Sequence, residues 1–174
     1  MALIKPFRAL RPVSELANKV AALPYDVMSS DEARVMAADN PYSFLHVDKA
    51  EIDLPSQTGL YDDIVYQTAR DNLQRMIREG VFLRELKPCL YLYRQVMDNR
   101  AQTGVVACAA IDDYLNGVIK RHELTRAEKE EDRMRHVDTC DAQTGPIFLT
   151  YHAREAINAL SERIMRQLPL YDFV

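Results

Sequence analysis

The sequence lacks three features that would assign it to a class at once: a long hydrophobic run, paired cysteines and an excess of positive charge. No apolar run approaches the roughly 18 residues that a membrane-spanning helix requires. Cys89, Cys108 and Cys140 form no CxxC pair, and an odd count without a secretory signal argues against a disulfide framework. No cysteine or histidine spacing matches a zinc signature. We therefore expect a cytoplasmic protein without a membrane span or a metal site.

The charge balance also limits the partners. Lys and Arg together number 22 and Asp and Glu 26, which gives a net charge of −4. This balance argues against a broad nucleic-acid-binding surface, although it leaves room for a local basic patch. Hydrophobic residues make up 48% and charged residues 28% of the 174 residues, which is typical of a folded globular chain. We expect residues 1–174 to form a single domain.

Local patterns predict where helices and strands lie. Ser29 and Glu32 have the spacing of a capping box, as do Thr125 and Glu128, so each pair predicts the start of a helix. Apolar residues recur at helical spacing in two further segments. The predicted helices cover residues 30–38, 59–79, 126–140 and 153–168. Alternation, proline and β-rich composition predict extended segments or strands at residues 4–12, 42–48, 89–96, 103–111 and 146–151.

These elements indicate an α+β fold. We expect one mixed, largely antiparallel sheet of about five or six strands with three or four helices. Residues 105–111 are apolar at every position, which is typical of a central strand that is covered on both faces. The chain ends on the strand-like segment 170–174, and we expect the sequence to be the N-terminal portion of a longer protein.

The stretch Lys120–Thr125 and the helix that should follow it carry most of the candidate chemistry. Lys129, Asp132, Arg133 and His136 recur at spacings of three and four, so they share one face of that helix. The stretch itself is expected at a strand-to-helix junction, where free backbone N–H groups favour anions. The alternative is a solvated surface helix with internal salt bridges. The thin apolar side of this helix fits either interpretation.

The segment Pro24–Val27 places a carboxylate, Asp26, beside Tyr25. A functional carboxylate and a turn-capping Asp are both consistent with this pattern. Together with the Lys120 stretch, with Lys129, Asp132 and Arg133, and with the segments Ile4–Pro12 and Asn40–Val47, it resembles the uncharacterised bacterial and archaeal family catalogued as domain of unknown function 1015. The resemblance runs from the first residues to the last and covers the front part of a family member.

The resemblance implies a link to nucleotide chemistry. Longer family members carry an Asp-Gly-His-His-Arg motif that looks like the phosphate-binding loop of the ParB, sulfiredoxin and free-serine-kinase superfamily. This motif is absent from the present sequence. A phosphate-binding loop would therefore belong to a further C-terminal domain of the same chain.

The leading hypothesis is a small-molecule phosphotransferase or phosphohydrolase that acts on serine or a similar hydroxy compound. Phosphoryl transfer needs cations for the transferring group and a base for the nucleophile. Four cations would contact phosphate: Lys120, Arg121, Lys129 and Arg133. Glu123 or His122 would act as the base, and Asp132 could hold Mg²⁺ through water. Thr125, Tyr25 and Asp26 are further binding candidates, and a nucleotide is the expected cosubstrate.

Two alternatives remain open. A regulatory module could bind a nucleotide or phosphate with the same basic cluster and catalyse nothing. A ParB-like DNA-associated protein is the third hypothesis, but the acidic balance and the absence of a helix-turn-helix pattern argue against it.

Overall fold

The computed structural model describes residues 2–122 and 124–173 and divides the chain into two compact units. Unit 1 comprises Met1–Arg11, Arg84–Leu124 and Leu149–Asp172, and unit 2 comprises Pro12–Leu83, Thr125–Phe148 and Phe173–Val174. Two of the points where the chain passes between the units lie in short strands, β2 (Leu10–Pro12) and β3 (Phe82–Arg84), which pair with each other. Each unit is described by itself below.

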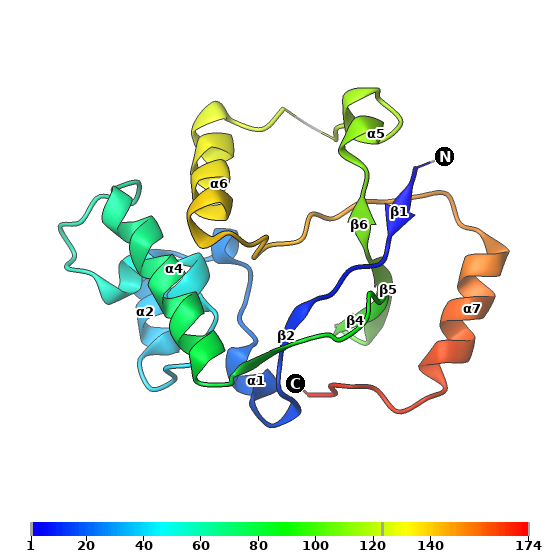
Figure 1. The fold of residues 1–174 in the computed structure, drawn as a ribbon, viewed down its shortest axis with the longest axis horizontal. Coiled ribbons are helices and arrows are strands. Elements are labelled where there is room, and N and C mark those ends of the chain that lie inside the picture. The colour runs from blue at the N-terminus through cyan, green and yellow to red at the C-terminus, as the bar shows by residue number, and fades with distance from the viewer. Residues whose placement is uncertain (1, 123, 174) are drawn as a thin grey trace. The chain divides into compact units, whose positions relative to one another are not determined.

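Unit 2 is helical (Figure 1). Its α-helices are α1 (Ala17–Val20), α2 (Ser30–Ala37), α3 (Leu45–Asp48), α4 (Asp63–Arg78) and α6 (Ala127–Cys140). Three 3-10 segments accompany them: η1 (Ser14–Leu16), η2 (Tyr25–Val27) and η3 (Ala50–Asp53). Every buried residue among those described belongs to this unit, including Leu45, Val47 and Met76. The apolar face of α4 supplies the largest share of this core, with Val65, Ala69, Leu73 and Met76.

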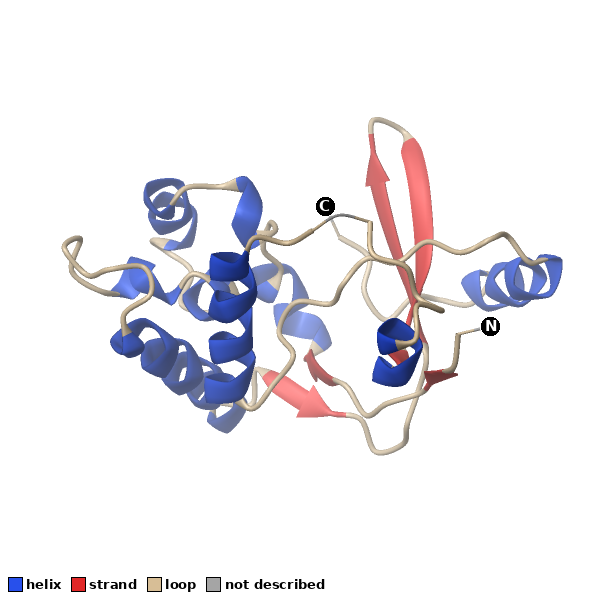
Figure 2. Ribbon diagram, turned by 90° about the horizontal axis from the view of Figure 1, so that it is seen from above, coloured by secondary structure: helices blue, strands red, loops and turns tan. Residues whose placement is uncertain are grey.

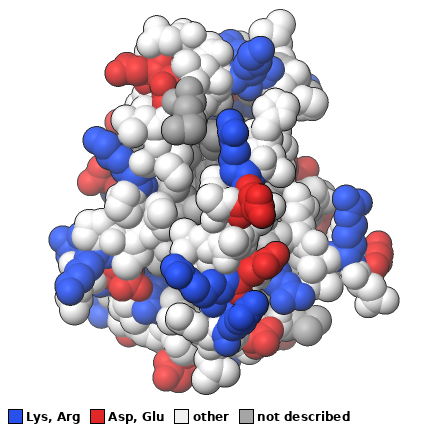
Figure 3. Space-filling view, turned by 90° about the vertical axis from the view of Figure 1, so that its right-hand side faces the viewer, with Lys and Arg blue, Asp and Glu red and all other residues white. Residues whose placement is uncertain are grey.

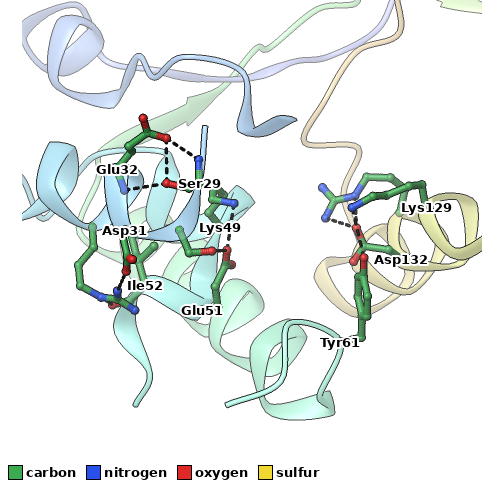
Figure 4. Close-up of polar contacts among 12 residues, drawn as sticks. Ser29, Asp31, Glu32, Lys49, Glu51, Ile52, Tyr61, Lys129 and Asp132 are labelled. Carbon is green, nitrogen blue, oxygen red and sulfur yellow. Dashed lines mark hydrogen bonds and ion pairs between the residues drawn. The ribbon is translucent and has the colours of Figure 1, made fainter. Parts of the chain in front are cut away.

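The capping box that the sequence predicts at α2 is confirmed. The Glu32 backbone N–H donates to Ser29 Oγ at 3.3 Å, and the Ser29 backbone N–H donates to Glu32 Oε2 at 2.8 Å (Figure 4). These bonds satisfy two backbone donors that a helix start leaves free. The hydrogen bonds that the Ser29 backbone N–H and hydroxyl donate to the Glu32 carboxylate also lower the pKa of Glu32. Ala33 and Ala37 on the opposite side of α2 pack with Leu45 and Ile52.

Unit 1 contains the longest strands of the chain. The strands β4 (Tyr91–Met97) and β5 (Arg100–Val106) form an antiparallel hairpin in which Tyr91 pairs with Val106 and Met97 with Arg100 (Figure 2). The short strands β1 (Ile4–Lys5) and β6 (Cys108–Ala109) form a second antiparallel pair. Two helices complete the unit: α5 (Ile111–Leu115) and α7 (Glu155–Met165).

The expected α+β class is confirmed, but the expected single sheet is wrong. The described residues form six short strands in three two-stranded sheets, and seven α-helices instead of three or four. The apolar run 105–111 is not one central strand, because β5 ends at Val106 and β6 leaves Cys108 and Ala109 exposed. A turn of helix then begins at Ile111. Apolar composition alone therefore did not indicate a sheet covered on both faces.

Three local predictions also fail. Residues 42–48 form a loop and the helix α3, in which the N–H groups of Val47 and Asp48 both donate to the Phe44 carbonyl. Residues 146–151 contain no strand, although α7 follows them close to its predicted place. Thr125 does not cap α6, whose N-cap is Arg126 without a side-chain capping bond.

No helix within the described ranges is both long and apolar enough to cross a bilayer. Acidic and basic side chains are intermingled on the face drawn in Figure 3. On this face the charges form no broad area of one sign, which agrees with the nearly balanced composition.

Candidate functional site

The candidate site of unit 2 is built on α6. Asp132 lies on the side of this helix that faces α4, and its two oxygens have different partners. Tyr66 of α4 donates its hydroxyl to Asp132 Oδ1 at 2.9 Å. Arg133 donates from Nε to Asp132 Oδ2 at 3.1 Å, and its Nη2 forms an ion pair with the same oxygen at 3.0 Å. We call Tyr25, Tyr66, Asp132 and Arg133 the α6 cluster.

The orientation of Arg133 is set by two contacts. Its guanidinium carbon lies 4.3 Å from the centre of the Tyr25 ring, which is a cation–π contact. Its side edge, formed by Nε and Nη2, is occupied by Asp132. A guanidinium has a second edge, formed by Nη1 and the other N–H of Nη2, which can bind an oxyanion with two parallel hydrogen bonds. Nη1 donates no hydrogen bond to any described residue, and 30% of the Arg133 side chain is exposed.

The other cations of α6 lie on tyrosine rings in a similar way. The Lys129 ammonium donates to the Tyr61 hydroxyl at 3.2 Å and lies 5.7 Å from the ring centre (Figure 4). This hydrogen bond raises the pKa of Lys129. Arg135 lies 4.3 Å from the Tyr66 ring centre, donates to the Tyr61 carbonyl at 2.9 Å and pairs with Asp63. The charges of α6 thus hold the helix against α4, which explains its thin apolar side.

A buried polar group lies on the same helix, one turn further along. His136 is 3% exposed, and its Nε2 donates to the Val47 carbonyl at 3.0 Å. Its Nδ1 and Asp48 Oδ1 are both buried and have no hydrogen-bond partner among the described residues. Burial raises the pKa of Asp48, while a hydrogen bond from Thr144 and the nearby His136 and Arg133 oppose that rise. A carboxyl group in this setting is a candidate for proton transfer.

Cys140 lies at the end of the same face and is 2% exposed. Burial raises the pKa of its thiol to about 11, and the negative charge of Asp48 adds to the shift. A thiol with such a pKa is a weak nucleophile near neutral pH. No group of three His, Cys, Asp or Glu side chains in the described part of the chain is arranged to hold a metal ion.

The sequence-predicted site residues are divided between the two units. Lys129, Asp132, Arg133 and Tyr25 come together in unit 2, as described above. Asp26 lies beside Tyr25 in η2 and is exposed, and so is Thr125 at the start of the α6 region.

The remaining predicted residues belong to unit 1. Lys120, Arg121 and His122 are exposed in the segment that follows α5, and no strand precedes them. The guanidinium of Arg121 lies 5.0 Å from the centre of the Tyr114 ring. Glu123, the predicted base, lies outside the described residues.

Sequence reasoning missed three contributors: Tyr66, Asp48 and the buried role of His136. His136 carried a usable signal, because it lies three residues after Arg133 on the predicted helix. Tyr66 and Asp48 carried none, since their contacts with α6 join segments far apart in the sequence.

Comparison with known proteins identifies the family. The model of the family described as "Protein of unknown function (DUF1015)" matches residues 4–174, nearly the whole chain. The chain belongs to this family. No curated protein and no solved structure matches the chain. The DUF1015 assignment confirms the resemblance seen in the sequence. Because the family is described as one of unknown function, we infer a function from the geometry around α6.

Proposed function

We propose that α6 binds the phosphate group of a small molecule, as part of a phosphotransferase or phosphohydrolase that acts on serine or a similar hydroxy compound. The observation that carries the proposal is that Arg133 Nη1 has no hydrogen-bond partner among the described residues, in a side chain that is 30% exposed. Asp132 and Tyr25 hold the guanidinium in one orientation, so little side-chain entropy remains to be lost when an oxyanion binds. Planar guanidinium edges match the oxygens of phosphate.

Lys129 supports the same proposal. It lies four residues before Arg133 on α6, so the two cations are neighbours on the helix surface. Its ammonium uses one of its three donors on Tyr61, which leaves donors for a second phosphate oxygen. Two cations near one group would stabilise the charge that develops during phosphoryl transfer.

The other predicted residues keep their proposed roles from the sequence. Lys120, Arg121 and His122 belong to unit 1. Phosphate contact by Lys120 and Arg121, and the role of His122 or Glu123 as the base, stay predictions from the sequence. The proposed cosubstrate is a nucleotide with Mg²⁺. Asp132 has a more specific role in this proposal than the sequence suggested, because its oxygens already bind Tyr66 and Arg133. We therefore assign it the orientation of Arg133 rather than primary metal binding.

The test separates binding from turnover. The 174-residue protein is titrated with pyrophosphate, with ADP and ATP in the presence of Mg²⁺, and with serine, and products are followed by phosphorus NMR. Arg133→Gln should raise the dissociation constant for pyrophosphate about tenfold or more, because each tenfold step corresponds to about 1.4 kcal/mol, within the range of a charged hydrogen bond. Arg78→Gln on exposed α4 surface is the matched control and should leave the constant unchanged. No binding by the wild-type protein would contradict the proposal.

A second candidate is a phosphate or nucleotide sensor without turnover. It is favoured by the engagement of Asp132 in hydrogen bonds, since a carboxylate that already accepts from Tyr66 and Arg133 is poorly placed to hold the Mg²⁺ that phosphoryl transfer would use. Binding that depends on Arg133 without any product, and that survives Glu123→Gln, would select the sensor over the enzyme.

A further inference from the structure

We propose that Tyr66 is a positioning residue that fixes the guanidinium of Arg133 through Asp132; this inference rests on the proposed function of Arg133 as a phosphate ligand. Tyr66 is 3% exposed and donates its hydroxyl to Asp132 Oδ1 at 2.9 Å. The other oxygen, Oδ2, accepts the hydrogen bond from Arg133 Nε and forms an ion pair with Nη2. The three side chains therefore form one chain of hydrogen bonds, with a buried anchor at one end and an exposed cation at the other.

Of the three hydrogen-bonded side chains, only Tyr66 comes from a helix other than α6. Asp132 and Arg133 are adjacent in sequence, so their mutual bonds move with α6. Tyr66 belongs to α4 and ties the Asp132 carboxylate to the rigid core of unit 2. Without that tie, the carboxylate can rotate about its side-chain torsions, and the guanidinium that follows it loses its fixed direction.

The Tyr66 hydroxyl stays protonated, so its hydrogen bond to Asp132 persists across the physiological pH range. Burial raises the pKa of Tyr66 to about 12, and the hydrogen bond to Asp132 adds to the rise. The phenol therefore remains a donor throughout the physiological range. A phosphate that binds Arg133 would meet a guanidinium whose position was set during folding, which lowers the ordering cost of binding.

The effect should be specific to Arg133. Arg135 lies on the face of the same Tyr66 ring, at 4.3 Å from its centre, and that contact needs only the ring. Tyr66→Phe keeps the ring and removes the hydroxyl. The substitution therefore separates the positioning role of the hydroxyl from the packing role of the aromatic side chain, and Arg135 serves as an internal control.

The experiment follows the arginine Nε–H signals of the 174-residue protein by NMR during titration with pyrophosphate. The variants Arg133→Lys and Arg135→Lys assign the two signals. In Tyr66→Phe we expect solvent exchange of the Arg133 Nε–H to accelerate about tenfold and the pyrophosphate dissociation constant to rise about three- to tenfold, as for loss of one hydrogen bond to a charged group. The Arg135 signal and the circular dichroism spectrum should stay unchanged. Tyr42→Phe, a substitution elsewhere in unit 2, should behave as wild type.

The possible failures are distinguishable. If the wild-type protein binds pyrophosphate and Tyr66→Phe changes neither Arg133 exchange nor affinity, the positioning inference is overturned and the proposed function stands. Equal changes at Arg133 and Arg135 would indicate general loosening of α6 and also overturn it. If the wild-type Arg133 signal does not respond to pyrophosphate, the proposed function fails, and the exchange rates alone decide whether Tyr66 holds Arg133.

Discussion

His46 Nδ1 lies 2.8 Å from Asp53 Oδ1, and this pair joins α3 to η3. The other ring nitrogen of His46, Nε2, lies 3.1 Å from the Asn40 carbonyl. A carboxylate and a carbonyl are both acceptors, so both ring nitrogens must carry hydrogen to satisfy the two contacts. The contacts therefore favour an imidazolium. Asn72 of α4 donates to Asp53 Oδ2 and to the His46 carbonyl, each at 2.8 Å, which connects a third segment.

This pair predicts a pH-dependent stability. The hydrogen bond to Asp53 raises the pKa of His46 above its ordinary value of 6.5. The stabilisation from this pair is therefore complete below about pH 6.5 and is lost as the pH rises through the folded-state pKa. Burial alone would raise the pKa of Asp53, but the hydrogen bonds with His46 and Asn72 outweigh burial and lower the pKa below its ordinary value of 3.8. The stabilisation from the ionised Asp53 is therefore lost as the pH falls through its folded-state pKa. His46→Gln should remove about 1–3 kcal/mol of stability near pH 5.5 and less near pH 8.5. Urea unfolding at both pH values checks this, and equal losses would contradict it.

Asp48 should behave in the opposite way from Asp53. Its Oδ1 is buried without a hydrogen-bond partner among the described residues, and burial raises its pKa, so ionisation near neutral pH opposes folding. Asp48→Asn replaces the carboxylate with an uncharged amide and should leave stability unchanged or raise it by about 1 kcal/mol at pH 7. Asp53→Asn should lower it by about 1–3 kcal/mol. The free energies of unfolding of the two variants, measured side by side, decide the point. A large loss in Asp48→Asn would show that its charge is compensated.

Two methionines of unit 2 should differ sharply in their contribution to the core. Met76 on α4 is 0% exposed, whereas Met134 on α6 is 55% exposed. Met76→Ala leaves a cavity in close-packed surroundings and should lower the free energy of unfolding by about 2–5 kcal/mol. Met134→Ala is the matched control and should change it by less than about 0.5 kcal/mol. Similar effects in both variants would contradict the placement of the core beneath α4.

The cysteines should react in the order of their exposure. Cys108 is exposed, whereas Cys140 is buried with its pKa raised to about 11. Because the thiolate is the reactive form, iodoacetamide at pH 8 should label Cys108 in the folded protein and Cys140 only after unfolding. Mass spectrometry of digested samples, with and without urea, measures both sites. Equal labelling of the two thiols in the folded protein would contradict the burial of Cys140.

The parts of the fold that the sequence predicted well depend on short-range interactions. The capping box of Ser29 and Glu32, the long amphipathic helix α4 and the β4–β5 hairpin all involve residues that are neighbours in the sequence. The failures arose where a short pattern had two solutions. Leu45 and Val47 are buried and His46 less so, which is a real alternation, yet it falls within a single helical turn. A pattern of this length cannot separate the two periods.

For α6, the sequence by itself determined that Lys129, Asp132, Arg133 and His136 share one face of a charged helix, because helical geometry fixes that spacing. It could not determine their partners. Only the tertiary structure placed Arg133 on Tyr25, Asp132 against Tyr66 and His136 against Val47. These contacts join segments far apart in the chain, so they depend on how the helices pack and not on local propensity. The same packing leaves Arg133 Nη1 without a hydrogen-bond partner among the described residues.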